Sequence, residues 1–402
     1  MRSYYCLPEK RLLFMTDILS AKNDLLFSIG YSQGLAGKDK DDFNIVIDGQ
    51  EIVVEAGRAI RTMDTVADGW TASIRWDPND SDLSAILKPF GYPPAECYLG
   101  GLLVIKGDMP TTKNILSATK KIKNLNGFSS TYNIIDSNVK PPYEQKKITL
   151  EERAKTLIER SDPPFGFKVI FDSKVLSDDE PFDKVTSKHG DKIFAHLASL
   201  ATQRGILITS TATGDLLFTK ANTKGKPVGT ISEDFPPGLN FEMEFDGRKR
   251  FHKYKVFAKS PGRNKRQKSK LKTASAIDLI VPEYRFMTFE ADDTSMGNAQ
   301  KAADWKRSKT IADVLTIPFP VSGWYAPNGE LWKENTLVTV KSPSLHVPDG
   351  FNFLIRSVEF EFQQGGIRSI LNLVPPQAFT GEPITEPWGI PEKGFLEGLL
   401  NG

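Results

Sequence analysis

The fold is decided by residues 309–374, which open with KTIADVLTIPFPVSGWYAPNGELWKENTLVTVKSP and close with FLIRSVEFEFQQGGIRSILNLV. Residues 358–362 alternate between apolar and acidic side chains, which is the period of a strand that buries one face. Residues 364–366 then turn the chain, and the run 367–374 ends before two prolines, which cannot continue a hydrogen-bonded ladder. The sequence therefore predicts an antiparallel hairpin here, with TLVTV upstream as a third strand.

The segment before this hairpin, GWYAPNGELWKEN, places two tryptophans around a PNG turn. Its order is Trp324, turn, Leu331-Trp332, Asn335, then Leu337-Val338. This ordered string resembles the second barrel of the baseplate hub proteins of contractile-tail phages of the Mu type, which are kin to late control protein D and to the hub portion of type VI secretion spike proteins. The resemblance covers roughly residues 41–378.

The first part of the chain is rich in strand signals. FNIVIDGQEIVV at residues 43–54 has Asp48-Gly49 at its centre, the pair of left-handed residues that a two-residue type I′ hairpin turn requires. Strand-like runs follow as far as NILSATKKIKN, and SDLSAILKPF between them is predicted to be a short helix. The pattern indicates a first barrel-type domain, and the family resemblance extends to this region.

The period changes to that of an α-helix near residue 148. Thr149 and Glu152 have the spacing of a capping box, and a second helix is expected from about Asp191 to Gln203, with Gly205 as its terminator. GILITSTATGDLLFTK then predicts a hairpin. A third helix is expected from Met296 to Arg307, after strands near Ala276 and Phe286.

We therefore expect a β-rich α+β protein, in which two β-barrel-type domains are separated by a small α/β insert. The expected divisions are an N-terminal arm at 1–40, a first barrel-type domain at 41–140, an α/β insert at 141–234, a second barrel-type domain at 235–378 and a C-terminal docking arm at 379–402.

Length and composition allow two or three domains with substantial cores, because 39% of the 402 residues are hydrophobic. The formal net charge is only +2, and two cysteines without metal spacing fit a reducing compartment. Residues 12–29 form an amphipathic pattern that charged residues interrupt, so neither a secretory signal nor a membrane span is expected. Translation could start at Met1 or at Met15.

The sequence contains none of the common catalytic or nucleotide-binding motifs, so we expect neither an enzyme nor a cofactor. His189 and His196 are seven residues apart and are interpreted as a helix-start and a helix-surface residue, because no cysteine or carboxylate cluster accompanies them as metal ligands would require. The acidic run at 178–183 is interpreted as a solvated turn rather than a catalytic carboxylate pair. No metal site is predicted.

A basic run at 259–272 holds seven Lys or Arg residues and no acid. It could bind phosphates with a steep dependence on salt, but no aromatic residue within it could stack on bases. The alternative is a solvated hairpin loop, because like charges at this density repel one another. The residues of this candidate contact loop are Arg263, Lys265, Arg266, Lys268 and Lys270.

The C-terminal segment FTGEPITEPWGIPEKGFLEGLLNG combines spaced prolines, which keep it out of a strand ladder, with large apolar residues. Such residues often mark an interface, so we expect an arm that docks on the spike or on a neighbouring subunit, although the segment could instead fold back on its own barrel. The candidate contacts are Trp388, Ile390, Phe395 and Leu399.

The resemblance implies a structural baseplate hub of a contractile tail, forming a homotrimeric, pseudo-hexameric ring. Such a ring would adapt a three-fold central spike to a six-fold tail tube and pass DNA through its lumen during ejection. The implied partners are the spike, the tail tube or its initiator protein, and the baseplate wedge proteins. The implied location is the virion tail baseplate, after assembly in the host cytoplasm and without membrane insertion.

Two alternatives from other classes remain open at this stage. One is a cell-wall glycan-binding protein that uses the helix and hairpin at 185–220. The other is a nucleic-acid-binding protein that uses the basic run, for which binding should collapse between low and moderate salt.

Overall fold

The computed structural model describes most of the chain after residue 37. The described residues are 38–77, 79–117, 121–177, 179–202, 204–234, 246–259, 271–281, 285–291, 299–363, 365–382, 384, 387 and 388.

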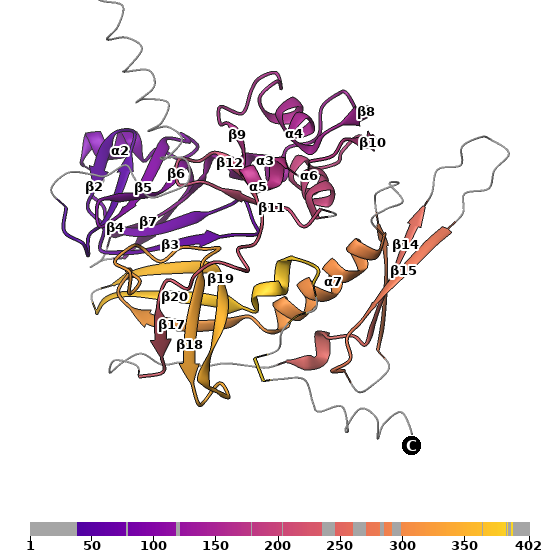
Figure 1. Ribbon diagram of the computed structural model, residues 1–402. Coiled ribbons are helices and arrows are strands. Elements are labelled where there is room, and N and C mark those ends of the chain that lie inside the picture. The colour runs from indigo at the N-terminus through magenta and orange to yellow at the C-terminus, as the bar shows by residue number, and fades with distance from the viewer. Residues whose placement is uncertain are drawn as a thin grey trace, which may run out of the picture.

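One large sheet of 12 strands dominates these residues, in the order β13-β18-β19-β3-β4-β7-β6-β5-β1-β2, with β20 on β19 and β17 on β20 (Figure 1). Its strands are β1 (Phe43–Ile47), β2 (Gln50–Ile52), β3 (Ala56–Thr62), β4 (Gly69–Arg75), β5 (Pro94–Leu99), β6 (Leu102–Leu116), β7 (Lys121–Ser129), β13 (Thr230–Ser232), β17 (Ile317–Ser322), β18 (Leu337–Ser342), β19 (Val347–Gln363) and β20 (Gly366–Val374).

The two regions expected to form separate barrels share this sheet. Strand β3 pairs antiparallel with the second half of β19, from Ser357 opposite Thr62 to Phe362 opposite Gly57. The two strands are about 300 residues apart in the chain, so no local pattern could reveal that they pair. The structure thus shows the expected β-rich fold, and among its described residues strands from both expected barrel regions lie in one curled sheet.

The first hairpin forms as predicted. Asp48 and Gly49 have φ values of 50° and 79°, as a type I′ turn needs, and Ile47 lies opposite Gln50. Phe43, Ile45 and Ile47 are all buried, so β1 covers the sheet interior with one face of the strand.

The second hairpin also follows its pattern. Val358 and Phe360 on β19 are fully buried, while the alternate residues Glu359 and Glu361 form ion pairs with Arg58 and Arg368. Glu359 is nevertheless only 9% exposed, so its face of the sheet is covered as well.

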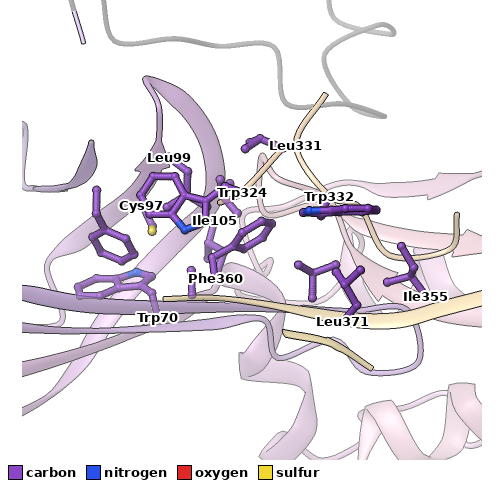
Figure 2. Close-up of a cluster of buried hydrophobic side chains, with 14 of the residues drawn as sticks. Trp70, Cys97, Leu99, Ile105, Trp324, Leu331, Trp332, Ile355, Phe360 and Leu371 are labelled. Carbon is purple, nitrogen blue, oxygen red and sulfur yellow. The ribbon is translucent and has the colours of Figure 1, made fainter. Parts of the chain in front are cut away.

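The main core lies inside the curl of the sheet and draws side chains from both ends of the chain. Figure 2 shows Trp70 and Cys97 from the first region beside Trp324, Trp332 and Phe360 from the second. The core is closely packed, since a Cβ at Gly127 would lie 2.3 Å from the indole of Trp70. Because one core serves both regions, neither can lose its partner without exposing apolar surface.

Nearly all members of a second apolar cluster come from residues 134–218, which overlap the expected α/β insert at 141–234. The capping box is present as predicted, since Thr149 and Glu152 exchange hydrogen bonds of 3.1 Å between side chain and backbone. The elements of the insert and the segment before it are η1 (Ser130–Tyr132), α3 (Asn133–Asp136), β8 (Glu144–Ile148), α4 (Leu150–Ile158), β9 (Val169–Phe171), α5 (Ser173–Leu176), β10 (Phe182–Thr186), α6 (Ile193–Thr202), β11 (Leu207–Ser210) and β12 (Leu216–Thr219).

The interpretation of the acidic run at 178–183 as a solvated turn is wrong for Asp179. Its side chain is 4% exposed, forms an ion pair with Arg204, and accepts hydrogen bonds of 3.0 Å from the backbone N–H groups of Leu150 and Glu151. A carboxylate at a helix N-terminus satisfies donors that the helix leaves free. Asp179 therefore links the N-terminus of α4 to Arg204, which follows α6.

Besides the short sheets β8–β10 and β11-β12-β9, a three-stranded sheet, here called the small sheet, stands apart from the large one. Strands β14 (Lys253–Lys259), β15 (Leu271–Ile277) and β16 (Phe286–Ala291) lie in the order β15-β14-β16, and α7 (Ala299–Val314) packs on one face of this sheet (Figure 1). Among the described residues the third helix continues beyond its predicted end at Arg307, because Ile311 and Ala312 extend its buried stripe. A short 3-10 turn, η2 (Gly247–Lys249), precedes this sheet.

Helix α7 is fastened to the large sheet by ion pairs. Asp64 lies 2.8 Å from Arg356 and 3.2 Å from Lys309, and Arg356 also pairs with Asp313 at 2.8 Å. Burial alone would raise the pKa of Asp64, but Arg356 and Lys309 more than offset it and hold the pKa below its usual value. The carboxylate therefore stays charged and connects β19 to α7 at neutral pH.

Within the described residues, no helix is both long and apolar enough to cross a bilayer.

Candidate assembly surfaces

A buried charge cluster joins three distant parts of the chain. Arg61 on β3 pairs with Asp68 at 3.5 Å and with Glu334 at 2.6 Å, and it donates to the carbonyl of Ser210 on β11 at 3.0 Å. The Ser210 hydroxyl donates in turn to Asp68 at 2.5 Å. The three charged side chains are between 1% and 6% exposed. We name Arg61, Asp68 and Glu334 the central charge cluster; it fixes the insert and the 323–335 loop on the large sheet.

The pKa values in this cluster follow from burial. Burial raises the pKa of Asp68 to about 6, despite the opposing effect of Arg61. For Glu334, burial acts in the same direction, but Arg61 more than compensates and the pKa is lowered. One carboxylate oxygen of Glu334 is buried without a hydrogen-bond partner in the described part of the chain. Two carboxylates thus share one guanidinium.

The outer edge of β17 is closed to further strands. Pro318 and Pro320 lie opposite Asn372 and Ile370 in the β17–β20 ladder. Prolines have no N–H, so they occupy positions whose backbone points away from β20, and the outer edge lacks two donors in succession. Prolines on an edge are a common way to block pairing with another chain.

The other ends of the large sheet lack this protection. Among the described residues, β2 pairs only with β1, and β13 pairs only with β18. Val53, which directly follows β2, is 87% exposed. These short edges are where an additional strand could be accommodated.

The small sheet leaves one face without cover from the described residues. Lys253 lies opposite Ile277 on one side and Phe286 on the other, so the three form a row across the sheet. Ile277 and Phe286 are 46% and 41% exposed, whereas Tyr254 and Val256, which point to the other face, are fully buried.

The beginning of the C-terminal segment folds onto its own chain. Phe379, at the end of η3 (Pro376–Phe379), is 1% exposed and packs on Trp305, and the Ser308 hydroxyl donates to the Glu382 carbonyl at 3.1 Å. The Trp388 indole donates to the Leu345 carbonyl at 2.6 Å while its side chain remains partly exposed. The other candidate contacts, Ile390, Phe395 and Leu399, lie outside the described residues.

Only the strands on either side of the basic loop, β14 and β15, are among the described residues. Strands β14 and β15 pair up to Lys259 opposite Leu271, so the loop joins the ends of a paired hairpin. Its five candidate contacts all lie outside the described residues: Arg263, Lys265, Arg266, Lys268 and Lys270.

One exposed feature was missed from the sequence. Helix α2 (Ser81–Ile86) ends before the expected residue 90, and Phe90 and Tyr92 beyond it are 87% and 56% exposed, with left-handed φ values of 64° and 47°. The sequence signal was the dense alternation of proline and glycine in KPFGYPP, which breaks a helix.

The histidines do not form a metal site with the described residues. His196 accepts a hydrogen bond of 3.2 Å from the guanidinium of Arg153, and burial together with that positive charge lowers the pKa of His196 to about 4. His189 instead packs on Tyr143, with ring centroids 4.2 Å apart and the ring planes tilted by 53°. His196 is thus more buried than a helix-surface residue, and no cluster of three metal-ligating side chains occurs in the described ranges.

The helix and hairpin at 185–220 are not a free-standing module in this structure. Strand β10 pairs with β8, and β12 pairs with β9, so the region is built into the sheets of residues 144–171.

Comparison with known proteins gives matches across this fold. The sequence model for the fourth domain of the Mu phage baseplate assembly protein GpP matches residues 295–382, and the model for the second domain of gp44-like baseplate hub proteins matches residues 131–220. The baseplate hub protein gp44 of Escherichia phage Mu is 25% identical over 289 residues, which is 70% of this chain and 74% of gp44. This chain is similar to the Mu-type baseplate hub proteins.

Two solved structures have a fold similar to that of this chain. The 43 kDa tail protein of prophage MuSo2 from Shewanella oneidensis is 23% identical, with a TM-score of 0.70 that covers 84% of this chain and 99% of that protein. A tail protein from Neisseria meningitidis MC58 is 18% identical, with a TM-score of 0.69 over 85% and 98% of the two chains. The predicted family resemblance is confirmed. It supports a structural role in a phage tail baseplate, and these relatives are named as hub and tail proteins rather than as enzymes.

Proposed function

We propose that this protein is the central hub of a contractile-tail baseplate and that it acts as a homotrimer. The relationship to gp44 along 70% of the chain carries this proposal. Three copies, each contributing two strand-rich regions, would give a ring with six similar sectors, which can join a three-fold spike to a six-fold tube. DNA would pass through the ring, and the neighbours in the tail would be the spike, the tube or its initiator, and the wedge proteins.

The form of the sheet supports this role. Its first and second regions are held together by β3–β19 pairing and by a shared core, so they would move as one block within a ring. The proline edge of β17 resists strand addition, whereas β2, β13 and the uncovered face of the small sheet offer surface for neighbouring subunits. In this proposal the protein has a structural role, in which its surfaces bind neighbouring subunits and no residue is catalytic.

Mass photometry of the purified chain tests the proposal, with negative-stain imaging of assembled tails as the second measurement. The expected result is a particle of three times 44.8 kDa, or a three-fold ring at the tail tip if partners drive assembly. A single copy per tail would contradict the proposal.

The C-terminal arm is proposed to dock on the spike or on an adjacent subunit. Truncation after Glu382 is the suitable variant, because it keeps Phe379 and the Ser308 contact in place. We expect the melting temperature to fall by only a few degrees, corresponding to the loss of about 1 kcal/mol at the Trp388 contact, and co-purification with the spike to be lost. A large loss of stability with intact spike association would show that the arm is part of the hub's own fold.

The basic loop is proposed to be dispensable for folding. Replacing residues 261–270 with a short glycine and serine linker is expected to change the free energy of unfolding by less than about 1 kcal/mol, because paired strands flank the loop. Denaturant unfolding checks this, with tail assembly as the second assay. Normal folding with failed assembly would assign the loop as a contact, whereas loss of cooperative unfolding would refute the prediction.

A further inference from the structure

We propose that a shallow depression between β8 and α4 binds the phosphate group of a small phosphomonoester, either free or carried on a lipid headgroup. The depression has a volume of about 370 Å³. We name it the β8–α4 pocket, and its lining residues are Gln145, Lys146, Lys147, Ile148, Glu152, Thr156 and Arg160. This proposal goes beyond the baseplate role and does not depend on it.

Three cations line the pocket. Lys146 and Lys147 come from β8, and Arg160 follows the C-terminal end of α4, on which Glu152 and Thr156 lie four residues apart. Within the described residues, no carboxylate forms an ion pair with any of the three cations. The carboxylate in the lining, Glu152, is already bound to the backbone N–H of Thr149 as part of the capping box. The pocket therefore has an excess of positive charge.

The local structure carries one feature that folding alone does not favour. It is not the pairing of Lys146 opposite Lys184 in the β8–β10 ladder, because Glu144 forms an ion pair with Lys184 at 2.8 Å and offsets the repulsion between the two lysines. Lys147 has a φ of 48°, a left-handed conformation that residues other than glycine, asparagine and aspartate seldom adopt. Features of this kind are retained at sites where the charge or the direction of a side chain has a use.

A buried guanidinium behind the pocket sets the direction of Gln145. Arg153 is fully buried, and its Nη1 donates to the Gln145 Oε1 at 2.6 Å and to the Pro142 carbonyl at 2.9 Å. Because arginine can only donate, the oxygen of Gln145 must face it, and the amide NH₂ is left for the pocket that Gln145 lines. The remaining partners of Arg153 are His196 and Ser187, both neutral, so its charge is not cancelled by a carboxylate in direct contact.

The chemistry of the lining favours a phosphate dianion over a carboxylate. Three cations and one amide donor match a group that carries close to two charges and several acceptor oxygens. The pocket is a single depression lined by seven residues, which fits one phosphate with a small substituent better than a polymer backbone.

The test measures binding of inorganic phosphate to the full chain at low ionic strength by ³¹P NMR. The pocket variant combines Lys147→Asn, chosen because asparagine tolerates the left-handed backbone, with Arg160→Gln. The matched control combines Lys174→Gln with Lys188→Gln, which removes the same charge from exposed positions of the same insert. Phosphate affinity should fall at least about tenfold in the pocket variant and stay within about twofold in the control.

Gln145→Glu is a second variant that keeps the bond to Arg153 and replaces the amide donor with an anionic oxygen. It should also lower phosphate affinity by about tenfold. Equal affinity in all variants, or an equal fall in the pocket variant and the control, would overturn the proposal.

Vesicles of phosphatidic acid and of phosphatidylcholine then identify the source. Binding to phosphatidic acid vesicles alone that is lost in the pocket variant assigns a lipid headgroup, whereas binding of inorganic phosphate without vesicle binding assigns a free phosphomonoester. Binding of a short single-stranded oligonucleotide that the variants weaken, without any binding of inorganic phosphate, would refute the phosphomonoester site in favour of nucleic acid.

Discussion

Replacement of Arg61 by methionine is expected to lower the free energy of unfolding at neutral pH by about 3–5 kcal/mol, the cost typical of removing one partner from a buried ion pair. Arg61 is the cation that faces both Asp68 and Glu334, which are nearly fully buried. Methionine keeps much of the side-chain volume, so the loss reports the charge and its hydrogen bonds rather than a cavity. Urea unfolding of the variant and of the wild type measures this difference in the free energy of unfolding.

The pH dependence provides a second observable for this variant. The pKa of Asp68 is raised to about 6 in the folded protein, so the folded state binds a proton more tightly than the unfolded chain does. Such a carboxyl group stabilises the fold as pH falls from about 6 towards its unfolded value near 4. Without Arg61, the pKa of Asp68 rises further, because the charge that lowers it is gone. The destabilisation by Arg61→Met should therefore be smaller near pH 5 than at neutral pH.

Arg75→Met is the matched control for the same chemical change. Arg75 also pairs with a carboxylate, Glu55, but its own side chain is 85% exposed. Solvent screens this pair, so the stability should change by less than about 0.5 kcal/mol at either pH. An equally small effect of Arg61→Met, or a larger effect near pH 5 than at neutral pH, would show that the central charge cluster does not hold the three segments together.

The sequence predicted the features that depend on neighbours in the chain. The Asp48-Gly49 turn and the capping box at Thr149 are set by residues within a few positions, and both occur as expected. The alternation at 358–362 likewise gave the buried face of β19 correctly, because side chains on a strand point to opposite faces.

The features that the sequence could not give depend on contacts across long loops. The pairing of β3 with β19 merges two regions that local patterns treat as separate. The sequence predicted that Asp179 is a surface acid, because its partner Arg204 lies 25 residues away and follows a helix. The central charge cluster is equally hidden, since Arg61 and Glu334 are 273 positions apart. In each case the amino-acid types fit an exposed position as well as a buried contact, and only the packing of the folded chain decides between the two.

The family resemblance rested on the tryptophan-containing loop, and the structure explains why that loop has such a distinct sequence. Trp324 is completely buried, and its indole N–H donates to the Glu361 carbonyl at 3.2 Å. Its ring meets Phe43 of β1 edge to face, with centroids 6.4 Å apart. The loop thus closes the core between the first strand of the large sheet and the final hairpin.

Trp324→Ala is therefore expected to cost about 3–5 kcal/mol, the range for truncating a large buried aromatic residue. Trp324→Phe should cost less, because it keeps most of the apolar area and loses chiefly the hydrogen bond to Glu361. Phe90→Ala serves as the control, since Phe90 is 87% exposed and should change stability by less than about 0.5 kcal/mol.

Thermal and urea unfolding of the three variants, each followed by tryptophan fluorescence and by circular dichroism, measures these effects. One core serves both regions of the large sheet. Trp324→Ala should therefore lower both the melting temperature and the urea midpoint, and each unfolding curve should remain a single cooperative step. Two separated transitions, with the first region unfolding at its original denaturant concentration, would mean that the regions are independent domains in spite of the β3–β19 ladder. A single shifted transition would instead show that the closure at Trp324 stabilises the large sheet as one cooperative unit.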